Sequence, residues 1–139
     1  MSTGSRGLHV VVPVRADTDF DTVRQFARDV AEVVVADDAA HRTVEVRKDK
    51  RGGRVYLDVM RNAYAQTAVA PYSVRARTGA PVATPLEWDE LDTRGLRADR
   101  FTIRDLPKRL AGQRDPCADV YRHARSLTGP RRRVARLLV

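Results

Sequence analysis

The chain has 139 residues, of which 42% are apolar and 32% are charged, a composition typical of a globular domain. No apolar run approaches the roughly 20 residues that cross a bilayer, and the single cysteine, Cys117, excludes an internal disulfide and a cysteine-based zinc cluster. The net charge is +8, and residues 47–77 and 122–139 each carry a net +6, which leaves the remainder negative. Two basic segments of this kind favour a polyanion as partner. The alternative is an arginine-rich composition without nucleic-acid binding.

The N-terminal part of the chain predicts a strand followed by a helix. Residues 8–14 alternate as a strand does, after the small, flexible turn STGSRG. Apolar residues at helical spacing from Phe20 to Val34 predict an amphipathic helix with one buried stripe. Asp19 is its expected N-cap, and Asp21 suits its first turn.

A pair of strands is predicted at residues 43–46 and 55–60, joined around RKDKRGG with a turn at Gly52-Gly53. Within RVYLDVMRN, Val55, Leu57 and Val59 are expected to form the buried face. Asp58 then lies in mid-strand, where aspartate is disfavoured, between Arg54 and Arg61.

The rest of the chain predicts short elements. The proline-punctuated segment APVATPLEWDEL is expected to be a loop that leads into a short helix near Trp88. From Gly129 the basic tail has too little apolar surface to fold alone, although Val134, Leu137 and Leu138 can dock. The other predicted elements are extended segments at 67–70 and 73–77 broken by Pro71, a strand at 101–103, a helical turn at 106–111 and a helix at 117–127.

Asp58 has three explanations on the residues alone. It can pair with a neighbouring arginine (Arg54, Arg61, Arg75 or Arg77), as most strand carboxylates do. It can bind Mg²⁺ or Mn²⁺, which prefer oxygen ligands, and a metal beside arginines is how nucleotidyl transfer is catalysed. It can also act as a general base, which would normally require a histidine partner or a raised pKa. His41 and His123 have no metal-ligand spacing to each other or to Asp58.

The turn STGSRGLH is a second candidate site. Its backbone amides, its hydroxyls and His9 can donate hydrogen bonds to phosphate oxygens. The P-loop pattern GxxxxGK[ST] is absent, and a flexible turn with a satisfied histidine explains the same residues.

The sequence resembles the polymerase domain of bacterial DNA ligase D in two longer stretches, GSRGLHVVVP and RKDKRGGRVYLDVMRNAYAQTAVAPYSVRARTGAPVATPLEWDEL. That domain is the primase-polymerase of non-homologous end joining, in the archaeo-eukaryotic primase superfamily. The resemblance runs from about Thr3 to near Asp119, and the run from Arg47 to Leu91 is its most specific part. It implies an α/β (α+β) fold with a mixed β-sheet and flanking helices, of which this chain corresponds to the C-terminal half.

The resemblance also implies roles for individual residues. Asp58 matches a catalytic, metal-binding aspartate for Mg²⁺ or Mn²⁺. Thr3 and His9 match the residues that hold the triphosphate. Further basic positions match as well: Arg6 in the same turn, Lys48 and Arg51 before the catalytic strand, and Arg75 and Arg77 in the nucleotide pocket. On the charge of the two basic segments, and not on the resemblance, DNA contacts are also expected from Arg54, Arg61, Arg131, Arg132 and Arg133.

Three features depart from the family pattern. The family's other two metal-binding carboxylates form a DxD motif upstream of the GLH turn, which this sequence does not show; Asp17-Thr18-Asp19 is better explained by helix capping. Ala65 stands where the family usually has glycine, which strains a turn if φ is positive there. Cys117 replaces a bulky aromatic residue, at a cost in packing.

The sequence therefore predicts a partial polymerase domain, residues 1–128, with a basic tail, residues 129–139. The intact domain would add NTP or dNTP to DNA ends in double-strand break repair. This chain alone is expected to bind DNA or nucleotides weakly and not to extend a primer. The alternatives are one half of a split enzyme, a non-catalytic DNA- or repair-complex-binding module, and a gene remnant that does not fold stably. Expected partners are a DxD-containing N-terminal half, a ligase domain or Ku, with a cytoplasmic, nucleoid-associated location and no membrane.

Overall fold

Two units make up the fold, and each is built from two separate stretches of the chain. The computed structural model describes residues 1–139. The first unit comprises Met1–Pro13 and Val69–Ala124, and the second comprises Val14–Ala68 and Arg125–Val139. Helices and a small sheet together give the mixed α/β architecture expected from the sequence.

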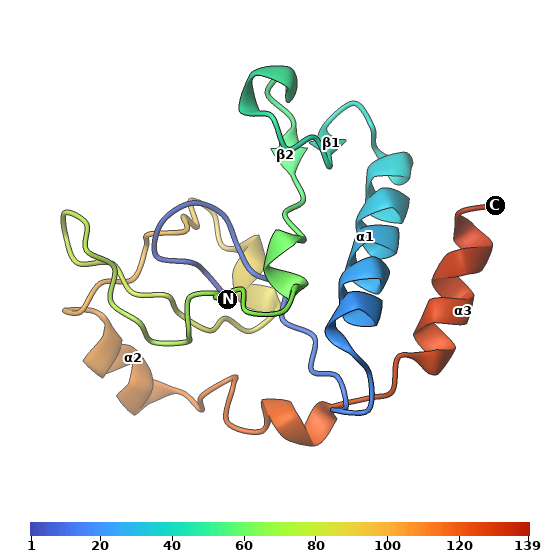
Figure 1. Cartoon of the computed structure of the whole chain (residues 1–139). Coiled ribbons are helices and arrows are strands. Elements are labelled where there is room, and N and C mark those ends of the chain that lie inside the picture. Colours follow the sequence, from blue (N-terminus) through green and yellow to red (C-terminus); the bar gives the residue numbers. More distant parts are fainter. The chain divides into compact units, whose positions relative to one another are not determined.

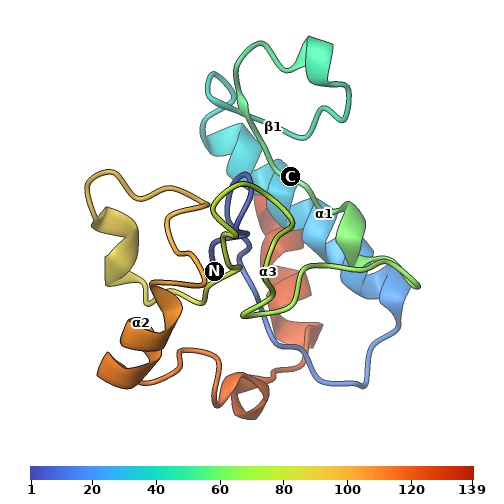
Figure 2. The same ribbon diagram turned by 90° about the vertical axis from the view of Figure 1, so that its left-hand side faces the viewer.

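Helix α1, Phe20–Asp37, is the longest element of the second unit. Its N-cap is Asp19, as predicted, because the Asp19 carboxylate accepts the Thr22 N–H at 2.8 Å. Helix α3, Thr128–Leu137, packs beside α1, so the basic tail is helical (Figures 1 and 2). The predicted buried stripe of α1 is narrower than expected. Only Ala31 is fully buried, and Phe20 is 56% exposed, with its ring edge-on to Tyr64.

The only sheet has two strands, β1 (Arg42–Thr43) and β2 (Val55–Tyr56), and they run parallel. The predicted pair of strands is present, but the first strand ends at Thr43 rather than Val46. The intervening loop contains the 3₁₀ helix η1, Lys48–Lys50, and the left-handed Gly52 and Gly53, which turn the chain as predicted. Together they bring β2 back in the same direction as β1.

The second predicted strand also ends early, at Tyr56 rather than Met60. The 3₁₀ helix η2, Met60–Asn62, takes the place of its last residues. Asp58 is therefore in the connection between β2 and η2, not in mid-strand. Val55, expected on the buried face, is 66% exposed.

Ala65 has φ = +55°, the left-handed conformation that the sequence comparison with glycine suggested. An L-residue with a Cβ pays about 1 kcal/mol or more in this region, whereas glycine does not. We therefore expect Ala65→Gly to raise the free energy of unfolding by about 1 kcal/mol in urea denaturation. Ala63→Gly is the matched control because Ala63 has φ = −90°; it is expected to destabilise. A destabilising Ala65→Gly would contradict the assignment of strain.

The centre of the first unit is the segment from Pro81 to Pro85, which is completely buried. The segment is irregular, as the loop prediction implied, but its burial was not expected. On one side Ala83 exchanges backbone hydrogen bonds with Tyr72 and Ser73, and on the other the Val82 N–H donates to the Phe101 carbonyl. The two prolines lack an N–H, so the ladder stays irregular and forms isolated bridges instead of strands.

Other predicted elements of the first unit are present in part. The short helix near Trp88 is η3, Asp89–Asp92, and the helical turn is α2, Leu106–Gly112. Residues 8–14 form no strand, since Val10 to Val12 are exposed and pair with nothing. Residues 101–103 make only the bridge from Thr102 to Pro81. The predicted helix 117–127 is reduced to the 3₁₀ helix η4, Val120–His123.

An ion pair fixes α2 to η3. The Arg109 guanidinium donates to both carboxylate oxygens of Glu90, at 2.6 and 2.7 Å, and to the Pro85 carbonyl at 2.9 Å. It also lies 4.5 Å from the centroid of the Phe101 ring. Arg109 is 10% exposed and Glu90 25%. This bidentate geometry is the strongest form of protein ion pair.

A second polar contact fixes the segment before α3. The Tyr72 hydroxyl donates to the Asp115 carboxylate, which also accepts the N–H of Cys117 at 2.9 Å. Burial is the main cause that raises the pKa of the Tyr72 phenol, and the nearby Asp115 raises it further. The same two causes raise the pKa of the half-buried Cys117 thiol. Cys117 is therefore held as a neutral thiol at neutral pH.

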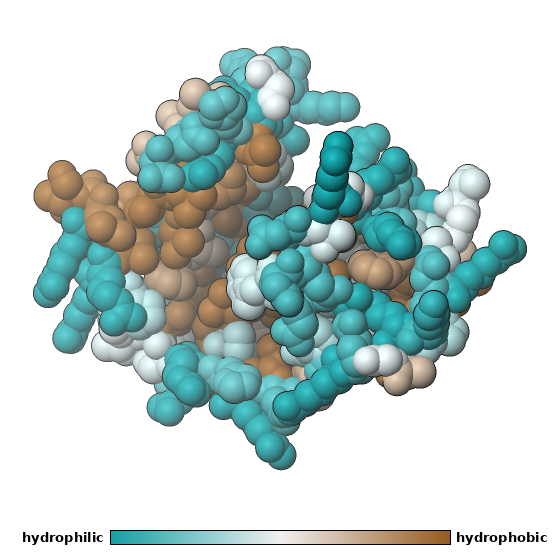
Figure 3. Space-filling view, turned by 180° about the vertical axis from the view of Figure 1, so that it is seen from behind, coloured by the Kyte–Doolittle hydropathy of each residue, from teal (hydrophilic) through white to brown (hydrophobic).

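Apolar side chains reach the surface in many places, seen as brown atoms in Figure 3. Val10, Trp88 and Tyr121 are each at least 74% exposed. None of the helices combines the length and hydropathy that crossing a bilayer requires.

Candidate functional site

The turn at residues 2–9 is attached to the buried centre of the first unit. Ser2 and Thr84 exchange both backbone hydrogen bonds, at 2.8 and 3.1 Å, and Ser2 is fully buried. Ser2 also forms an antiparallel bridge with Leu8, while the His9 N–H donates to the Met1 carbonyl. The two ends of the turn are thus closed on each other and held against the core.

The hydroxyl of Thr3 organises the turn from inside. It lies 3.1 Å from the carbonyls of both Arg6 and Gly7, to which it donates, and it accepts the N–H of Ser5 at 3.3 Å. Thr3 is 7% exposed. The structure therefore gives Thr3 the role of shaping the turn, and the surface of the turn is formed by the residues that follow it.

Gly4 allows the turn to pack closely on the segments beneath it. A Cβ at this position would lie 2.8 Å from Cγ of Arg75 and 3.0 Å from the backbone of Val82 and Ala83, and Gly4 has φ = +63°. Its N–H donates to the Ala98 carbonyl at 2.9 Å. Only glycine fits this close approach, which places Arg75 directly against the turn.

The exposed side of this turn is rich in hydrogen-bond donors. The Arg77 guanidinium donates to the hydroxyl of Ser5. The guanidinium groups of Arg6 and Arg75, and the backbone N–H groups of Arg6 and Gly7, have no acceptor within the chain. Amides and guanidinium groups gathered at a turn with left-handed glycines form a surface that suits an anion. Ser5 was not singled out in the sequence, although its place among the hydroxyls of STGSRG was the available signal.

Asp58, in the second unit, is exposed, and its carboxylate accepts the Met60 N–H at 2.9 Å. This contact is an Asx turn, which explains why aspartate precedes η2. The structure contains no group of three or more histidine, cysteine, aspartate or glutamate residues that could hold a metal ion. One exposed carboxylate does not meet the coordination that Mg²⁺ or Mn²⁺ requires. The residues present therefore do not make a divalent-metal site by themselves.

Most arginines around Asp58 stabilise the local backbone. Arg51 donates to the carbonyls of Glu45 and Val46, at 2.9 and 2.7 Å, and lies 3.8 Å from the ring centroid of Tyr56. Arg54 donates to the carbonyls of Arg51 and Lys50 in the same way. Their side chains close the loop between β1 and β2.

Other cations of the second unit remain available to a ligand. Arg61 donates only to the Gln66 side chain, at 3.2 Å, and Lys48 is exposed with no partner in the chain. The arginines at 131, 132 and 133 are exposed on the first half of α3, whose first turn has no acid. Positive charge near a helix N-terminus opposes the helix dipole, so these arginines do not serve the stability of α3.

The residues predicted to form one site are thus divided between the two units. The first unit contains Thr3, Arg6, His9, Arg75 and Arg77, and within it Arg75 and Arg77 contact the turn. The second unit contains Lys48, Arg51 and Asp58.

Residues 1–117 match the family described as "LigD, primase-polymerase domain". The chain belongs to this family. LigD proteins are similar to most of the chain. "Multifunctional non-homologous end joining protein LigD" of Pseudomonas aeruginosa is 34% identical over 121 residues, which cover 85% of this chain and 14% of that protein. "Bifunctional non-homologous end joining protein LigD" of Bacillus subtilis is 30% identical over 122 residues, 87% of this chain and 20% of that protein.

A solved LigD structure supports the same assignment. The "Polymerase Domain from Mycobacterium tuberculosis Ligase D in complex with DNA" has a TM-score of 0.70 and 30% sequence identity. The match covers 77% of this chain and 37% of that chain. The chain thus shares the fold of part of a LigD polymerase domain and spans well under half the length of each relative.

Proposed function

We propose that the chain forms part of a LigD-type polymerase domain and supplies the side of the site that binds the triphosphate of an incoming NTP or dNTP. The packing of the turn at residues 2–9 on Arg75 and Arg77 is the observation that supports the proposal. It places the Arg75 side chain against the turn and joins the Arg77 guanidinium to the Ser5 hydroxyl, while the backbone N–H groups of Arg6 and Gly7 have no acceptor within the chain. Charge-assisted hydrogen bonds from such groups are the strongest that proteins offer a phosphate.

The intact domain would add nucleotides at DNA ends during non-homologous end joining, the process in the names of the relatives. On this proposal, Arg61 and the arginines at 131–133 contact the DNA backbone, and the protein works on the nucleoid in the cytoplasm. Ku and a ligase domain are its proposed partners. Asp58 would contribute one carboxylate to an Mg²⁺ or Mn²⁺ site, but its surroundings do not complete that site, and no step of the proposal passes through a metal.

The test is a titration of the intact chain with ATP in the presence of a chelator, monitored by NMR or fluorescence. Arg75→Gln and Arg77→Gln are each expected to weaken binding about tenfold, because each removes a charge-assisted hydrogen bond worth about 1.5 kcal/mol or more. Arg114→Gln is the control, since it removes an equal charge from an exposed pair with Asp119 in the same unit. Equal losses in all three variants would refute a specific triphosphate site.

A further inference from the structure

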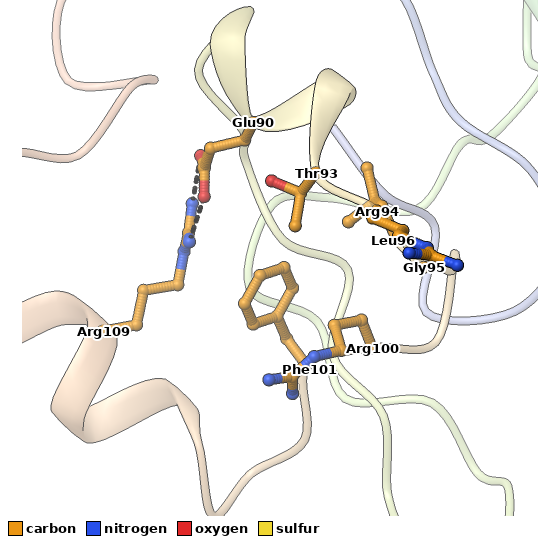
Figure 4. A pocket seen from close by; sticks show the side chains of 8 residues that line it. All are labelled: Glu90, Thr93, Arg94, Gly95, Leu96, Arg100, Phe101 and Arg109. Carbon is orange, nitrogen blue, oxygen red and sulfur yellow. Dashed lines mark hydrogen bonds and ion pairs between the residues drawn. The ribbon is translucent and has the colours of Figure 1, made fainter.

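A cavity of about 180 Å³ lies in the first unit, and its lining includes none of the residues assigned a role in nucleotide binding. Figure 4 shows the ring of Phe101 near its middle, with the Glu90–Arg109 pair on one side and the 93–96 turn on the other. This space is smaller than the roughly 300–1,000 Å³ of pockets that take a whole small molecule, but it is large enough for a phosphate group. The lining residues are Glu90, Thr93, Arg94, Gly95, Leu96, Arg100, Phe101 and Arg109.

The charges around the cavity are not balanced. Glu90 is neutralised by the bidentate pair with Arg109, so these two residues form a fixed wall. The remaining ionic groups of the lining are Arg94 and Arg100, both exposed and neither in an ion pair. Asp105 is an acid whose charge reaches Arg100, since Arg100 contributes to the lowered pKa of Asp105, but its carboxylate accepts hydrogen bonds from Thr102 and forms no ion pair with Arg100. The cavity lining therefore has two cationic groups that form no ion pair within the chain.

Neutral hydrogen-bond donors also line the cavity. The Thr93 hydroxyl is exposed and donates to no group of the chain. Gly95 has φ = +78°, and its N–H has no acceptor within the chain. Arg100 lies 5.6 Å from the centroid of the Phe101 ring, which holds its guanidinium at the rim. Guanidinium groups, a hydroxyl and an amide beside a left-handed glycine are the donors that proteins present to phosphate oxygens.

We propose that this cavity binds one backbone phosphate of single-stranded nucleic acid, through Arg94 and Arg100. The site uses other residues than the turn at residues 2–9, although the Gly4 N–H of that turn donates to Ala98, which lies between Arg94 and Arg100 in the chain. It adds a nucleic-acid contact to the unit that holds the turn. A phosphodiester of a strand and a free phosphate share this chemistry, and the experiment below separates them.

The experiment measures binding of a thymidine oligonucleotide of about 12 residues to the intact chain at several salt concentrations. The double variant Arg94→Gln/Arg100→Gln is expected to bind about tenfold more weakly. The slope of log K against log salt is expected to fall by about 0.7, the value for one phosphate of a single strand. Arg94→Lys/Arg100→Lys keeps the charge and is expected to keep most of the slope, which excludes unfolding as the cause.

Lys108→Gln/Arg114→Gln is the matched control because it removes two charges from the same unit outside the cavity lining. If the Arg94→Gln/Arg100→Gln variant behaves as this control does, the proposal is overturned. Inorganic phosphate is titrated in parallel: a variant that loses phosphate binding but keeps oligonucleotide affinity would also overturn it, in favour of a free-phosphate site. ATP binding at the turn of residues 2–9 is expected to be unchanged in the Arg94→Gln/Arg100→Gln variant. A failure of the proposed phosphate site can therefore be told apart from a failure of the proposed triphosphate site.

Discussion

Replacing Gly4 with alanine is expected to destabilise the first unit by about 3 kcal/mol. The left-handed φ of +63° costs an L-residue about 1 to 2 kcal/mol. The new Cβ also meets Cγ of Arg75 at 2.8 Å and two backbone atoms at 3.0 Å, and overpacking of this kind costs about 1 to 3 kcal/mol. The measurement is the midpoint and slope of urea denaturation, followed by tyrosine and tryptophan fluorescence.

Gly7→Ala separates the two causes. Gly7 has nearly the same dihedral angle, φ = +76°, but a Cβ there meets nothing within 4 Å. Its expected cost is therefore the backbone strain alone, about 1 kcal/mol. Since Gly4→Ala also moves the turn away from Arg75, it should weaken ATP binding, even under conditions where the chain is folded. Equal stabilities of the two variants would show that the close packing of the turn is not formed in solution.

The second large effect is expected from Arg109→Met, about 2 to 3 kcal/mol of destabilisation. The substitution leaves Glu90 as an unpaired, largely buried carboxylate and the Pro85 carbonyl without its donor. Arg97→Met is the control, because the pair of Arg97 with Asp99 is exposed and contributes little. The double variant Glu90→Gln/Arg109→Met should recover about 1 to 2 kcal/mol relative to additivity. Strict additivity in this cycle would mean that the pair does not interact.

The same pair predicts a pH dependence. The hydrogen bond from Arg109 lowers the pKa of Glu90 in the folded protein. A lowered pKa stabilises the fold at pH values above the normal range of glutamate, about 4.3, and this stabilisation is lost as the pH falls through the folded pKa. Wild type should therefore lose stability in acid more steeply than Arg109→Met, whose Glu90 titrates without its partner. Parallel profiles of the two proteins would contradict the assignment.

Local patterns in the sequence predicted the elements that local forces determine. Helix α1 follows from its 3.6-residue period, and its start follows from the capping aspartate at 19. The turn at Gly52-Gly53 follows from the steric freedom of glycine, whereas the positive φ of Ala65 was suggested only by the resemblance to a family that usually has glycine there. These features depend on neighbours a few positions apart, so the sequence contains their causes directly.

Long-range pairing was not predictable in the same way. Val55 alternates with its neighbours as a buried strand residue does, but it is exposed, whereas Leu57 and Val59 of the same predicted face are half-buried. The segment from Pro81 to Pro85 has the prolines of a loop, yet partners from both sides and from Ser2 bury it. Its burial depends on residues up to 82 positions away, which no local pattern reports.

The candidate site also combines features that the sequence suggested with features that it did not. Arg75 and Arg77 were predicted by resemblance, and the structure brings both to the turn. Thr3 was expected to face a ligand, whereas its hydroxyl is committed to the turn itself. Ser5 escaped notice because the sequence alone gives no means of ranking the hydroxyls of the turn. The free donors near Phe101 lie on segments that fold from separate stretches, and only the structure shows that they share a cavity.

The interleaving of the two units has a consequence for biosynthesis. Ser2 pairs with Thr84, and Val14 pairs with Arg125, so each unit joins an early stretch of chain to a late one. A nascent chain leaving the ribosome cannot close the first unit before the segment around Thr84 emerges, nor the second before the segment around Arg125. Until then its valine-rich early segments have no native partners, and they are exposed to aggregation or to chaperones. Translation speed and chaperone supply should therefore determine the yield of folded protein more than in a chain whose units follow one another.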